Sequence, residues 1–563
     1  MAVIKSRTLF FFTSPRSPYK MLPEIEVLKE HFLGTKWNSE TQIAFMQQLL
    51  KSDFFSSSTV SKDMALSARD RINRGPKALG LVDLNPVVAL TPAGLDFLDP
   101  DESSEALTKQ LLKFQLPSPY HQLPKQKEGV ASYDFCVKPF LEILRLIFLL
   151  GKLTMDELMI FGLQLTNFNK FEHLVCKILM FRQRKKLTKL SYKAFVKDSL
   201  HQEICHIYQD EITHGRTTTR QSQDNCIDKF VRTKASNMQD YADACFRYLR
   251  ATGLVHISQS GRSISIDESK YEDVMFILDS LPRTPVFVDD EQSYKQYLFD
   301  NNTPNLLTND LEHLREKIAQ IDRNFKACNI KEAKRQFSNI VQKRQQALIA
   351  EQVADLKSGV HTQDVLECFS DIKNNNLFDP PLMLEWNTWR ALNILNGGNI
   401  IANLKFDDNG QPLATARGNQ ADIVCDYGGF VLTVEATLQS GHKQYEAEGE
   451  SVLRHLAKIK QEYHKPAFCF FIAPKINESC ITYFYALHKI KLSSYQGESV
   501  VLPIPLDVFV SMVESASKVH IRPTAENVLR LCKFSLNKAL NAKSEAEWFA
   551  ALTDKALNWL NLD

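Results

Sequence analysis

The stretch GNQADIVCDYGGFVLTVEATLQSGHKQYEAEGESVLRHLAKIK, residues 418–460, decides the fold of the C-terminal part of the chain. Asp422 starts a short apolar run, the turn-forming residues 427–429 follow, and a second apolar run ends just after Glu435. Two such runs around a Gly-rich turn predict a β-hairpin, and the polar residues after them predict a helix. A hairpin this tight can bring Asp422 and Glu435 close together.

Asp422 and Glu435 are a candidate metal-binding pair. Two carboxylates at the level of a sheet offer the hard oxygen ligands that Mg²⁺ prefers. Mg²⁺ between carboxylates and a phosphate polarises the phosphoryl oxygen and makes hydroxide available near neutral pH, as phosphodiester hydrolysis requires. An Asp and a Glu separated by one strand also occur by chance in many proteins, so the pair alone does not establish this chemistry.

Three further side chains fit the same site. Glu448 and His455 are seven residues apart on the predicted helix, so they share one face. Glu448 could bind metal or act as a base, and His455 could move a proton or hold the scissile phosphate. Glu385 lies among apolar residues on an earlier helix, where a carboxylate needs a partner such as a metal. The alternatives are exposure on a polar helix for the first two and pairing with Arg390 for Glu385.

Residues 380–563 have the pattern of an α/β domain. A helix with Trp386 and Trp389 on its apolar face comes first, and short apolar runs separated by helices follow. This pattern predicts a central, largely buried sheet. The preceding residues 286–379 are helical and highly charged, which favours an exposed helical linker or a partner-binding helix.

Residues 1–124 and 125–285 both contain the outline of a winged helix, so the chain as a whole is predicted to be multidomain α+β and α/β. In the first, amphipathic stretches up to 61–79 precede a strand, turn, strand and short helix in 80–98. In the second, a helix in 237–257 precedes a hairpin strand. The repeat is one of architecture and not of sequence.

The front of the chain is basic. Residues 1–250 carry 35 Lys and Arg against 27 Asp and Glu, although the whole chain has a net charge of only +2. A basic half suggests a polyanionic partner, most often nucleic acid. Basic residues gather in three places, at 69–77, 177–197 and 216–234. A solvated helix face is the alternative for each of them.

Composition excludes several classes of protein. The 563 residues are 44% hydrophobic and 24% charged, which excludes a disordered or collagen-like chain. The most apolar run, near 140–150, is interrupted by charges and too short to span a bilayer, so we expect a cytoplasmic protein without membrane contact. The eleven cysteines form no CxxC pair, which argues against a disulfide framework and a structural zinc site.

The sequence resembles the AlwI/MlyI/PleI group of type IIS restriction endonucleases, which includes nicking large subunits, within the PD-(D/E)xK nuclease superfamily. The resemblance extends over nearly the whole chain. Its motifs are LFFFTSPRSP (9–18), ALSARDRINRGPKALGLVDLNPVVALTPAG (65–94), LTKQLLKFQLPSPYH (107–121), ASNMQDYADACFRYLRATGLV (235–255), LEWNTWRAL (384–392), the segment from Asp422 to His455, and FCFFIAPK (468–475).

This resemblance implies a modular, Mg²⁺-dependent enzyme. Two winged-helix-like recognition subdomains, 1–124 and 125–285, would read a short asymmetric duplex site, and a linker, 286–379, would join them to a PD-(D/E)xK cleavage domain, 380–563. The resemblance implies that Asp422, Glu435 and Glu448 bind metal, that Glu385 completes the acidic site and that His455 is the catalytic histidine. The usual lysine two residues after the second acid is Thr437 here, which leaves open which group orients the attacking water; Glu448 and His455 are the candidates.

The resemblance also implies DNA recognition by basic side chains. MlyI- and PleI-like members read GAGTC and AlwI reads GGATC, and this chain resembles the first group more closely. One such site cuts one strand, so cutting both requires a transient homodimer or a small-subunit partner. The candidate DNA-contacting residues are Arg16, Arg69, Arg71, Arg74, Lys77, Arg216, Arg220, Lys229, Arg232 and Lys234.

Three other activities fit part of the sequence. A strand-specific nicking enzyme, or the large subunit of a heterodimeric enzyme, would carry the same residues. A winged-helix DNA-binding regulator with a non-catalytic C-terminal domain would explain the basic half but not the five acid and His side chains. A nuclease of low specificity would cut without a fixed offset from one site.

Overall fold

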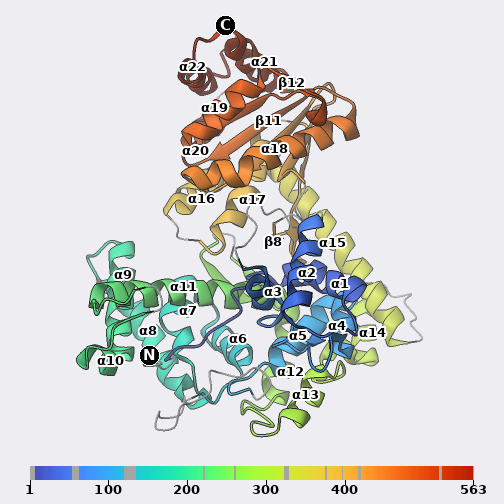
Figure 1. The fold of residues 1–563 in the computed structure, drawn as a ribbon, viewed down its shortest axis with the longest axis vertical. Coiled ribbons are helices and arrows are strands. Elements are labelled where there is room, and N and C mark those ends of the chain that lie inside the picture. The colour runs from blue at the N-terminus through green and yellow to red at the C-terminus, as the bar shows by residue number, and fades with distance from the viewer. Residues whose placement is uncertain are drawn as a thin grey trace. The chain divides into compact units, whose positions relative to one another are not determined.

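The fold is that of a computed structural model of the chain (Figure 1). By their contacts the residues form two compact units. The first is built by the chain up to Ile340 and the second mostly by the chain from Val341 onward. The structure describes residues 7–52, 63–118, 135–219, 222–258, 261–321, 329–374, 377–395, 397–415, 420–518 and 523–561.

The second unit is built on a five-stranded mixed sheet in the order β14-β11-β10-β9-β6. The pairs β10/β11 and β11/β14 are parallel, whereas β9 is antiparallel to both β10 and β6. Every residue of β10 and β11 is buried, which agrees with the central, buried sheet that the sequence predicts. The strands are β6 Asn399–Ala402, β9 Ile423–Asp426, β10 Val431–Ala436, β11 Ala467–Ala473 and β14 Val501–Pro505, with two short ladders, β7 Lys405–Phe406 with β8 Pro412–Ala414 and β12 Lys491–Leu492 with β13 Gly497–Glu498.

Helices pack on this sheet. Two neighbouring helices, α17 and α20, contact its strands, and so does a second neighbouring pair, α18 and α19. The fully buried rings of Trp389 and Trp548 belong to the apolar core that results. The helices are α16 Thr362–Asn374, α17 Pro380–Leu395, α18 His442–Tyr463, α19 Glu478–Leu487, α20 Leu506–Lys518, α21 Ala525–Asn541 and α22 Glu545–Leu557.

The β9–β10 hairpin sets the position of the acidic residues. Val434 pairs with Ile423, so Asp422 lies next to this ladder and opposite Glu435. The turn contains Gly428 at φ +82°, a backbone conformation that glycine adopts without strain. The hairpin predicted from residues 418–460 therefore agrees with the structure.

Among its described residues, the N-terminal part of the first unit has five α-helices, a short 3-10 helix at Pro18–Lys20 and one two-stranded ladder. Its helix α3 ends at Ile72, shortly before the Gly75-Pro76 pair, which is typical of a helix end. Hydrogen-bonded turns follow because Pro76 has no backbone N–H to continue the helix. The order strand, turn, strand and short helix then appears as predicted. The elements are α1 Met21–His31, α2 Ser39–Lys51, α3 Met64–Ile72, β1 Val82–Asp83, β2 Ala89–Leu90, α4 Pro92–Leu98 and α5 Ser103–Lys113.

The middle of the first unit contains a three-stranded antiparallel sheet in the order β3-β5-β4. The 24-residue helix α11 ends at Arg250, so the helix predicted over 237–257 is wrong at its C-terminal end, where Val255–Ile257 form the strand β4. The strand β5 returns beside β4, so the predicted hairpin is present. The elements are α6 Pro139–Leu150, β3 Leu153–Thr154, α7 Met155–Ile160, α8 Phe171–Leu187, α9 Tyr192–Ile207, α10 Gln209–Thr213, α11 Ile227–Arg250, β4 Val255–Ile257 and β5 Ser263–Ile266.

The charged segment after these subdomains is helical, as expected. Its helices are α12 Tyr271–Ser280, α13 Glu291–Phe299, α14 Leu311–Ala319 and α15 Ile330–Ser358. The long helix α15 begins in the first unit and continues past Ile340 into the second. The four domain ranges predicted from the sequence remain predictions, because contacts divide the chain into two units only.

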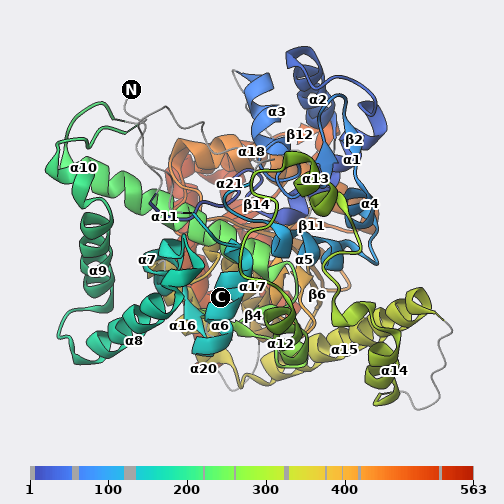
Figure 2. The same cartoon turned by 90° about the horizontal axis from the view of Figure 1, so that it is seen from below.

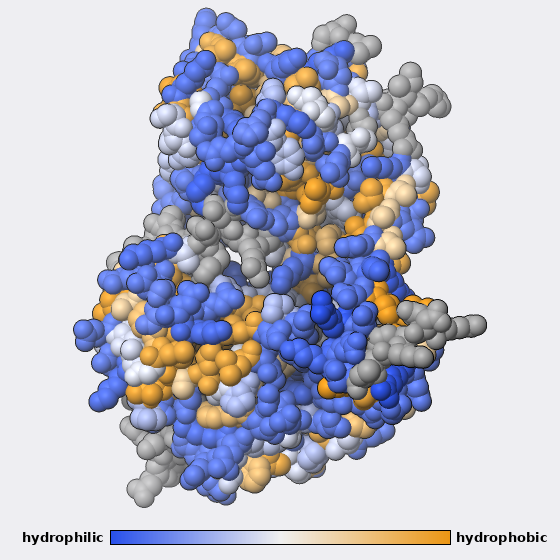
Figure 3. All heavy atoms as spheres, turned by 90° about the vertical axis from the view of Figure 1, so that its right-hand side faces the viewer, coloured by the Kyte–Doolittle hydropathy of each residue, from blue (hydrophilic) through white to orange (hydrophobic). Residues whose placement is uncertain are grey.

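The described surface gives no indication of a membrane span. Figure 3 shows a face that is largely hydrophilic, with apolar residues in separate patches. The most apolar helix, α6, has only 12 residues and includes Glu142 and Arg145. Within the described ranges, no helix is both long enough and apolar enough to cross a bilayer.

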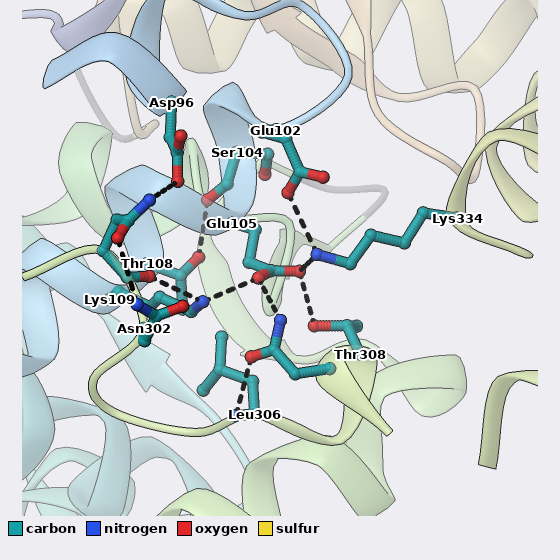
Figure 4. Close-up of polar contacts among 12 residues, drawn as sticks. Asp96, Glu102, Ser104, Glu105, Thr108, Lys109, Asn302, Leu306, Thr308 and Lys334 are labelled. Atoms are coloured by element: carbon teal, nitrogen blue, oxygen red, sulfur yellow. Dashed lines mark hydrogen bonds and ion pairs between the residues drawn. The ribbon is translucent and has the colours of Figure 1, made fainter. Parts of the chain in front are cut away.

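A largely buried ion-pair network joins the start of α15 to α5 in the first unit (Figure 4). Glu105 pairs with Lys334 at 2.9 Å and with Lys109 at 2.9 Å. Lys334 also pairs with Glu102 at 3.0 Å, and Thr308 donates a hydrogen bond to Glu105 at 2.8 Å. Burial alone would raise the pKa of Glu105, but the charges and hydrogen bonds of Lys334 and Lys109 lower it to about 2.

Replacing Glu105 should destabilise the first unit in a pH-dependent way. Because the folded-state pKa lies below the ordinary value of 4.5, the contribution is present above that pH and is lost as the pH falls toward 2. We expect Glu105→Gln to lower the free energy of unfolding at pH 7 by on the order of 2 kcal/mol, and by less at lower pH.

Urea denaturation of the full chain at pH 7 and near pH 4 measures this difference. The control is Glu312→Gln, which removes an exposed carboxylate paired with Arg315 and should leave stability nearly unchanged. An equal loss for both variants at pH 7, or a Glu105→Gln effect that grows on acidification, would contradict the assigned role of the network.

Candidate active site

Five predicted site residues come from four adjoining elements of the second unit. Glu385 lies on α17 and Asp422 directly precedes β9. Glu435 lies on β10, and Glu448 and His455 lie on α18. Both α17 and α18 contact β10, so the fold brings residues that are up to 70 positions apart in the sequence to one place.

The two acids of the hairpin are held close together by the backbone. Oδ2 of Asp422 accepts a hydrogen bond from the backbone N–H of Ala436 at 2.8 Å, immediately after Glu435. Burial raises the pKa of Asp422 well above its ordinary value, and the charge of Glu435 raises it further. Burial, followed by the charge of Glu448, does the same to Glu435. Two acids that hinder each other's ionisation are therefore fixed side by side.

His455 bonds directly to one of these acids. Its Nδ1 lies 2.8 Å from Oε1 of Glu435, and both residues are buried. Burial lowers the pKa of His455 to about 4, so the imidazole is neutral at pH 7. A neutral ring that donates from Nδ1 to a carboxylate carries its lone pair on Nε2. That Nε2 is buried and has no hydrogen-bond partner among the described residues.

Glu448 is oriented by a residue to which the sequence alone assigned no role. The hydroxyl of Thr437 hydrogen-bonds to Glu448, and although this bond lowers the pKa of Glu448, burial raises it more. Thr437 occupies the position where the wider nuclease pattern has lysine. The departure from the pattern was visible in the sequence, but its contact with α18 was not, because it depends on how the helix packs on the sheet.

Glu385 completes the acidic cluster. It is 9% exposed, and its Oε2 has no hydrogen-bond partner within the part of the chain that the structure describes. Burial raises its pKa well above the ordinary value, and the charges of Asp422, Asp379, Glu435 and Glu448 add to the effect. Asp379, just before α17, was not among the residues predicted from the sequence, and its position before two prolines indicates only a helix start.

The arrangement lacks positive charge and offers oxygen ligands. Burial raises the pKa of all four carboxylates, and neighbouring acids raise it further in Glu385, Asp422 and Glu435. The nearby histidine is neutral, so a divalent cation would supply positive charge. Among the described residues, no three His, Cys, Asp or Glu side chains already stand as a metal cluster. Asp422 and Glu435 each use one oxygen on a protein partner, Ala436 N–H and His455 respectively, which leaves the other oxygen of each for a ligand.

The basic residues predicted to contact DNA in the N-terminal part are mostly engaged within the first unit. Lys77 is partly buried, and burial lowers its pKa. The others have polar or acidic partners. These are Asp240 for Arg16 (2.8 Å), Gln42 for Arg69 (3.3 Å), Glu24 for Arg71 and Asp70 for Arg74 (2.8 Å).

The second basic group is engaged in the same way. Of its members, Arg220 lies outside the described residues. The partners of the others are Asp210 for Arg216 (2.7 Å), Asp224 for Lys229, the carbonyl of Asp228 for Arg232 (3.3 Å), and the rings of Tyr208 and Phe230 for Lys234 (4.5 and 5.2 Å to the centroids). DNA contact by either group stays a prediction, and it would require these cations to exchange an internal partner for a phosphate or a base.

The solved structures that match parts of the chain include two from restriction endonucleases. The small subunit (R.BspD6I2) of the heterodimeric restriction endonuclease R.BspD6I is 25% identical, with a TM-score of 0.28 over 35% of this chain and 95% of that chain. The second is the BpuJ1 endonuclease binding domain in the crystal structure of its complex with pyrene- and phenanthrene-modified DNA. This domain is 14% identical, with a TM-score of 0.34 over 50% of this chain and 92% of that chain.

Sequence comparison is more informative than these structural matches, because both TM-scores are low. No curated protein sequence matches the chain. The family model described as AlwI restriction endonuclease matches residues 77–512, which include all five residues of the acidic site and most of the first unit. With well over half of its length matched, the chain belongs to the AlwI restriction endonuclease family.

Proposed function

We propose that this type II restriction endonuclease is of subtype IIS. It binds a short asymmetric duplex site, GAGTC by resemblance, and hydrolyses phosphodiester bonds a few base pairs away with Mg²⁺. The observation that carries the proposal is the group of four carboxylates and one neutral histidine gathered around the end of β10. Buried acids that repel one another are costly to keep unless a cation or a reaction uses them.

Asp422, Glu435 and Glu448 are the residues that would hold the metal. Their oxygens are the ligand type that Mg²⁺ takes, and the Thr437 bond to Glu448 fixes the third of them. When bound, Mg²⁺ polarises the phosphoryl oxygen and lowers the pKa of a coordinated water. Glu385, with an oxygen that has no hydrogen-bond partner among the described residues, lies close enough to raise the charge density of the same site.

His455 has the geometry of a proton acceptor. In this proposal Nδ1–H of His455 donates to the ionised carboxylate of Glu435, which sets the tautomer and leaves the Nε2 lone pair available in the site. As Nε2 takes a proton from the attacking water, the carboxylate of Glu435 stabilises the imidazolium that forms. This assignment gives His455 the task that the missing lysine performs in the wider nuclease pattern.

The first unit supplies DNA recognition in this proposal. A winged-helix-like subdomain is supported by α11 before the β4–β5 hairpin and by the sheet order β3-β5-β4, with α8, α9 and α10 inserted between α7 and α11. The ladder β1/β2 after α3 repeats the outline in reduced form. Recognition by one unit and cleavage by the other gives a cut at a distance from the site that is read.

One acidic site cuts one strand, so cutting both strands needs a second cleavage domain. A transient homodimer or a separate small subunit would provide it, and a chain acting alone would nick. The alternative from another class is a winged-helix regulator with a structural C-terminal domain. That function does not explain the buried acidic cluster.

Removing Glu435 should abolish cleavage and spare DNA binding. The Glu435→Ala variant loses a metal ligand and the partner of His455, so we expect at least a 1000-fold slower cleavage of plasmid in Mg²⁺, on the order of what loss of a central catalytic group costs. Specific binding should stay within about twofold, because the residue lies outside the recognition unit.

Measuring the midpoint of thermal unfolding in EDTA shows whether the variant is folded when cleavage is lost. Removing Glu435 relieves its repulsion by Glu448 but leaves Nδ1 of His455 without its partner, so the midpoint shows whether the variant is still folded. The matched control is Glu462→Ala, which removes an exposed acid near the end of α18 and should cut at the normal rate. Cleavage by Glu435→Ala at the rate of the unaltered protein would show that the active site lies elsewhere.

Thr437 should act as a positioning residue for Glu448. Thr437→Val keeps the shape of the side chain and removes its hydroxyl, so we expect a 10- to 100-fold lower kcat with little change in KM, as for other groups that orient metal ligands. The requirement for Mg²⁺ should shift to higher concentration. Thr437→Ser, which restores the hydroxyl, should recover most of the rate, and equal activity of the Val and Ser variants would rule out this role.

End mapping distinguishes the modes of cleavage. Supercoiled plasmid incubated with the purified chain in Mg²⁺ should give ends at a constant offset from one five-base-pair sequence, and EDTA should prevent it. Circles opened in one strand at such an offset indicate a nicking enzyme or a large subunit without its partner. Ends without a common neighbouring sequence would indicate a nuclease of low specificity, and intact plasmid that is still bound would favour the regulator.

A further inference from the structure

The first unit contains a basic surface whose cations are not already neutralised. Residues 177–197 hold eight Lys and Arg and no acid. Lys177 pairs with Glu203 at 2.7 Å and Arg182 with Glu157 at 2.7 Å. Arg184 and Lys185 lie over aromatic rings of α9. Four exposed lysines remain, here called the four-lysine surface: Lys186, Lys189, Lys193 and Lys197.

These four side chains differ from the candidate DNA-contacting residues at 69–77 and 216–234. Within the residues that the structure describes, none of the four forms an ion pair, whereas Arg16, Arg71 and Arg216 each have an acidic partner. The neighbouring acid on α9, Asp198, is hydrogen-bonded to Gln202. The positive charge of the four-lysine surface is therefore directed to solvent and is available to an external anion.

Helix stability does not account for all of these positions. Cations at the C-terminal end of a helix are favourable, which explains Lys186 at the end of α8. Lys193 is the second residue of α9, where the helix dipole disfavours a cation, and the first turn of α9 contains no acid. Positive charge and N-terminal backbone N–H groups at one place form an environment for an anion.

The two helices present this surface rigidly. Phe181 of α8 stacks on Phe195 of α9 with the ring centroids 4.9 Å apart, and both rings are buried. The ring of Tyr192 lies under Lys185, and its hydroxyl donates a hydrogen bond to Asp156 on α7 at 2.5 Å. Figures 1 and 2 both show α8 and α9 at the outer edge of the first unit.

We propose that the four-lysine surface binds the sugar-phosphate backbone of duplex DNA next to the base pairs that the enzyme reads. The inference rests on the proposed function, because it requires this chain to bind DNA. Residues 186–197 contain no Arg, Asn or Gln, the side chains that read base edges by paired hydrogen bonds. Lysine is a point charge on a flexible stem, which suits contact with phosphate. The surface contributes affinity and position, and not sequence preference.

The salt dependence of binding is the direct measure of such contacts. Each neutralised phosphate contributes about −0.9 to the slope of log K against log salt concentration. We therefore expect a variant with all four lysines changed to Gln to have a slope less steep by about 2 to 4, and at least tenfold weaker binding near physiological salt. The loss should be equal for a duplex with the mapped site and for a scrambled duplex.

The experiment uses the full chain carrying Glu435→Ala, with fluorescence anisotropy of the two labelled duplexes over a range of NaCl concentrations. The variant is Lys186→Gln, Lys189→Gln, Lys193→Gln and Lys197→Gln together. The control removes four other exposed cations, from α15, and so matches the change in net charge: Lys331→Gln, Arg335→Gln, Lys343→Gln and Arg344→Gln. Circular dichroism should show the same thermal midpoint for the variant and the parent, because all four lysines are exposed.

Each outcome decides the proposal. A smaller slope in the variant and an unchanged slope in the control support it. Equal changes in both would mean that net charge alone is responsible, and an unchanged slope in the variant would overturn the contact while leaving the proposed function intact. A loss confined to the mapped site would mean that these residues read bases. Failure of the parent chain to bind either duplex would overturn the proposed function and this surface together.

Discussion

The second unit is organised around acids that repel one another in one buried place, and the surrounding fold has to overcome this repulsion. Glu385, Asp422, Glu435 and Glu448 are brought together by one hairpin and two helices. Burial raises the pKa of each, and neighbouring acids raise the pKa of the first three further. Such a cluster opposes folding, so the surrounding sheet must hold it. The fully buried strands β10 and β11 and the helices packed on them provide that support. Stability is used here to maintain the cluster that, in the proposed function, binds a cation and a phosphate.

Charged residues are arranged differently in the two units. In the second unit, acids of like charge lie close together, and in the proposed function a cation from outside the chain neutralises them. In the first, most of the predicted DNA-contacting cations are already satisfied internally, as in the pairs Arg16–Asp240 and Arg216–Asp210. The network around Glu105 is the extreme case, because two lysines bring the pKa of a largely buried acid down to about 2. Ion pairs therefore stabilise the first unit, whereas the acidic cluster of the second unit is available for ligand binding in the proposed function.

Local pattern and resemblance anticipated much of this arrangement, and long-range packing accounts for what they missed. The hairpin that carries Asp422 and Glu435 follows from two apolar runs around a Gly-rich turn, and the helical spacing of Glu448 and His455 placed both on one face. The contact between Thr437 and Glu448, the proximity of Asp379 to Glu385 and the pairing of Arg16 with a residue 224 positions away depend on tertiary packing. Sequence periodicity contains no information about such partners.

The internal ion pairs of the recognition unit have a consequence for how the enzyme would search a genome. A cation that must leave a carboxylate before it meets a phosphate releases fewer counterions, so its hold on arbitrary DNA is weak. Long residence at wrong sequences slows a search, whereas brief visits let the protein hop and slide to new positions. Arginines that keep their internal ion pairs until contacts with the correct bases compensate for breaking them would shorten the residence time at non-specific DNA. They would lengthen it at the recognition site.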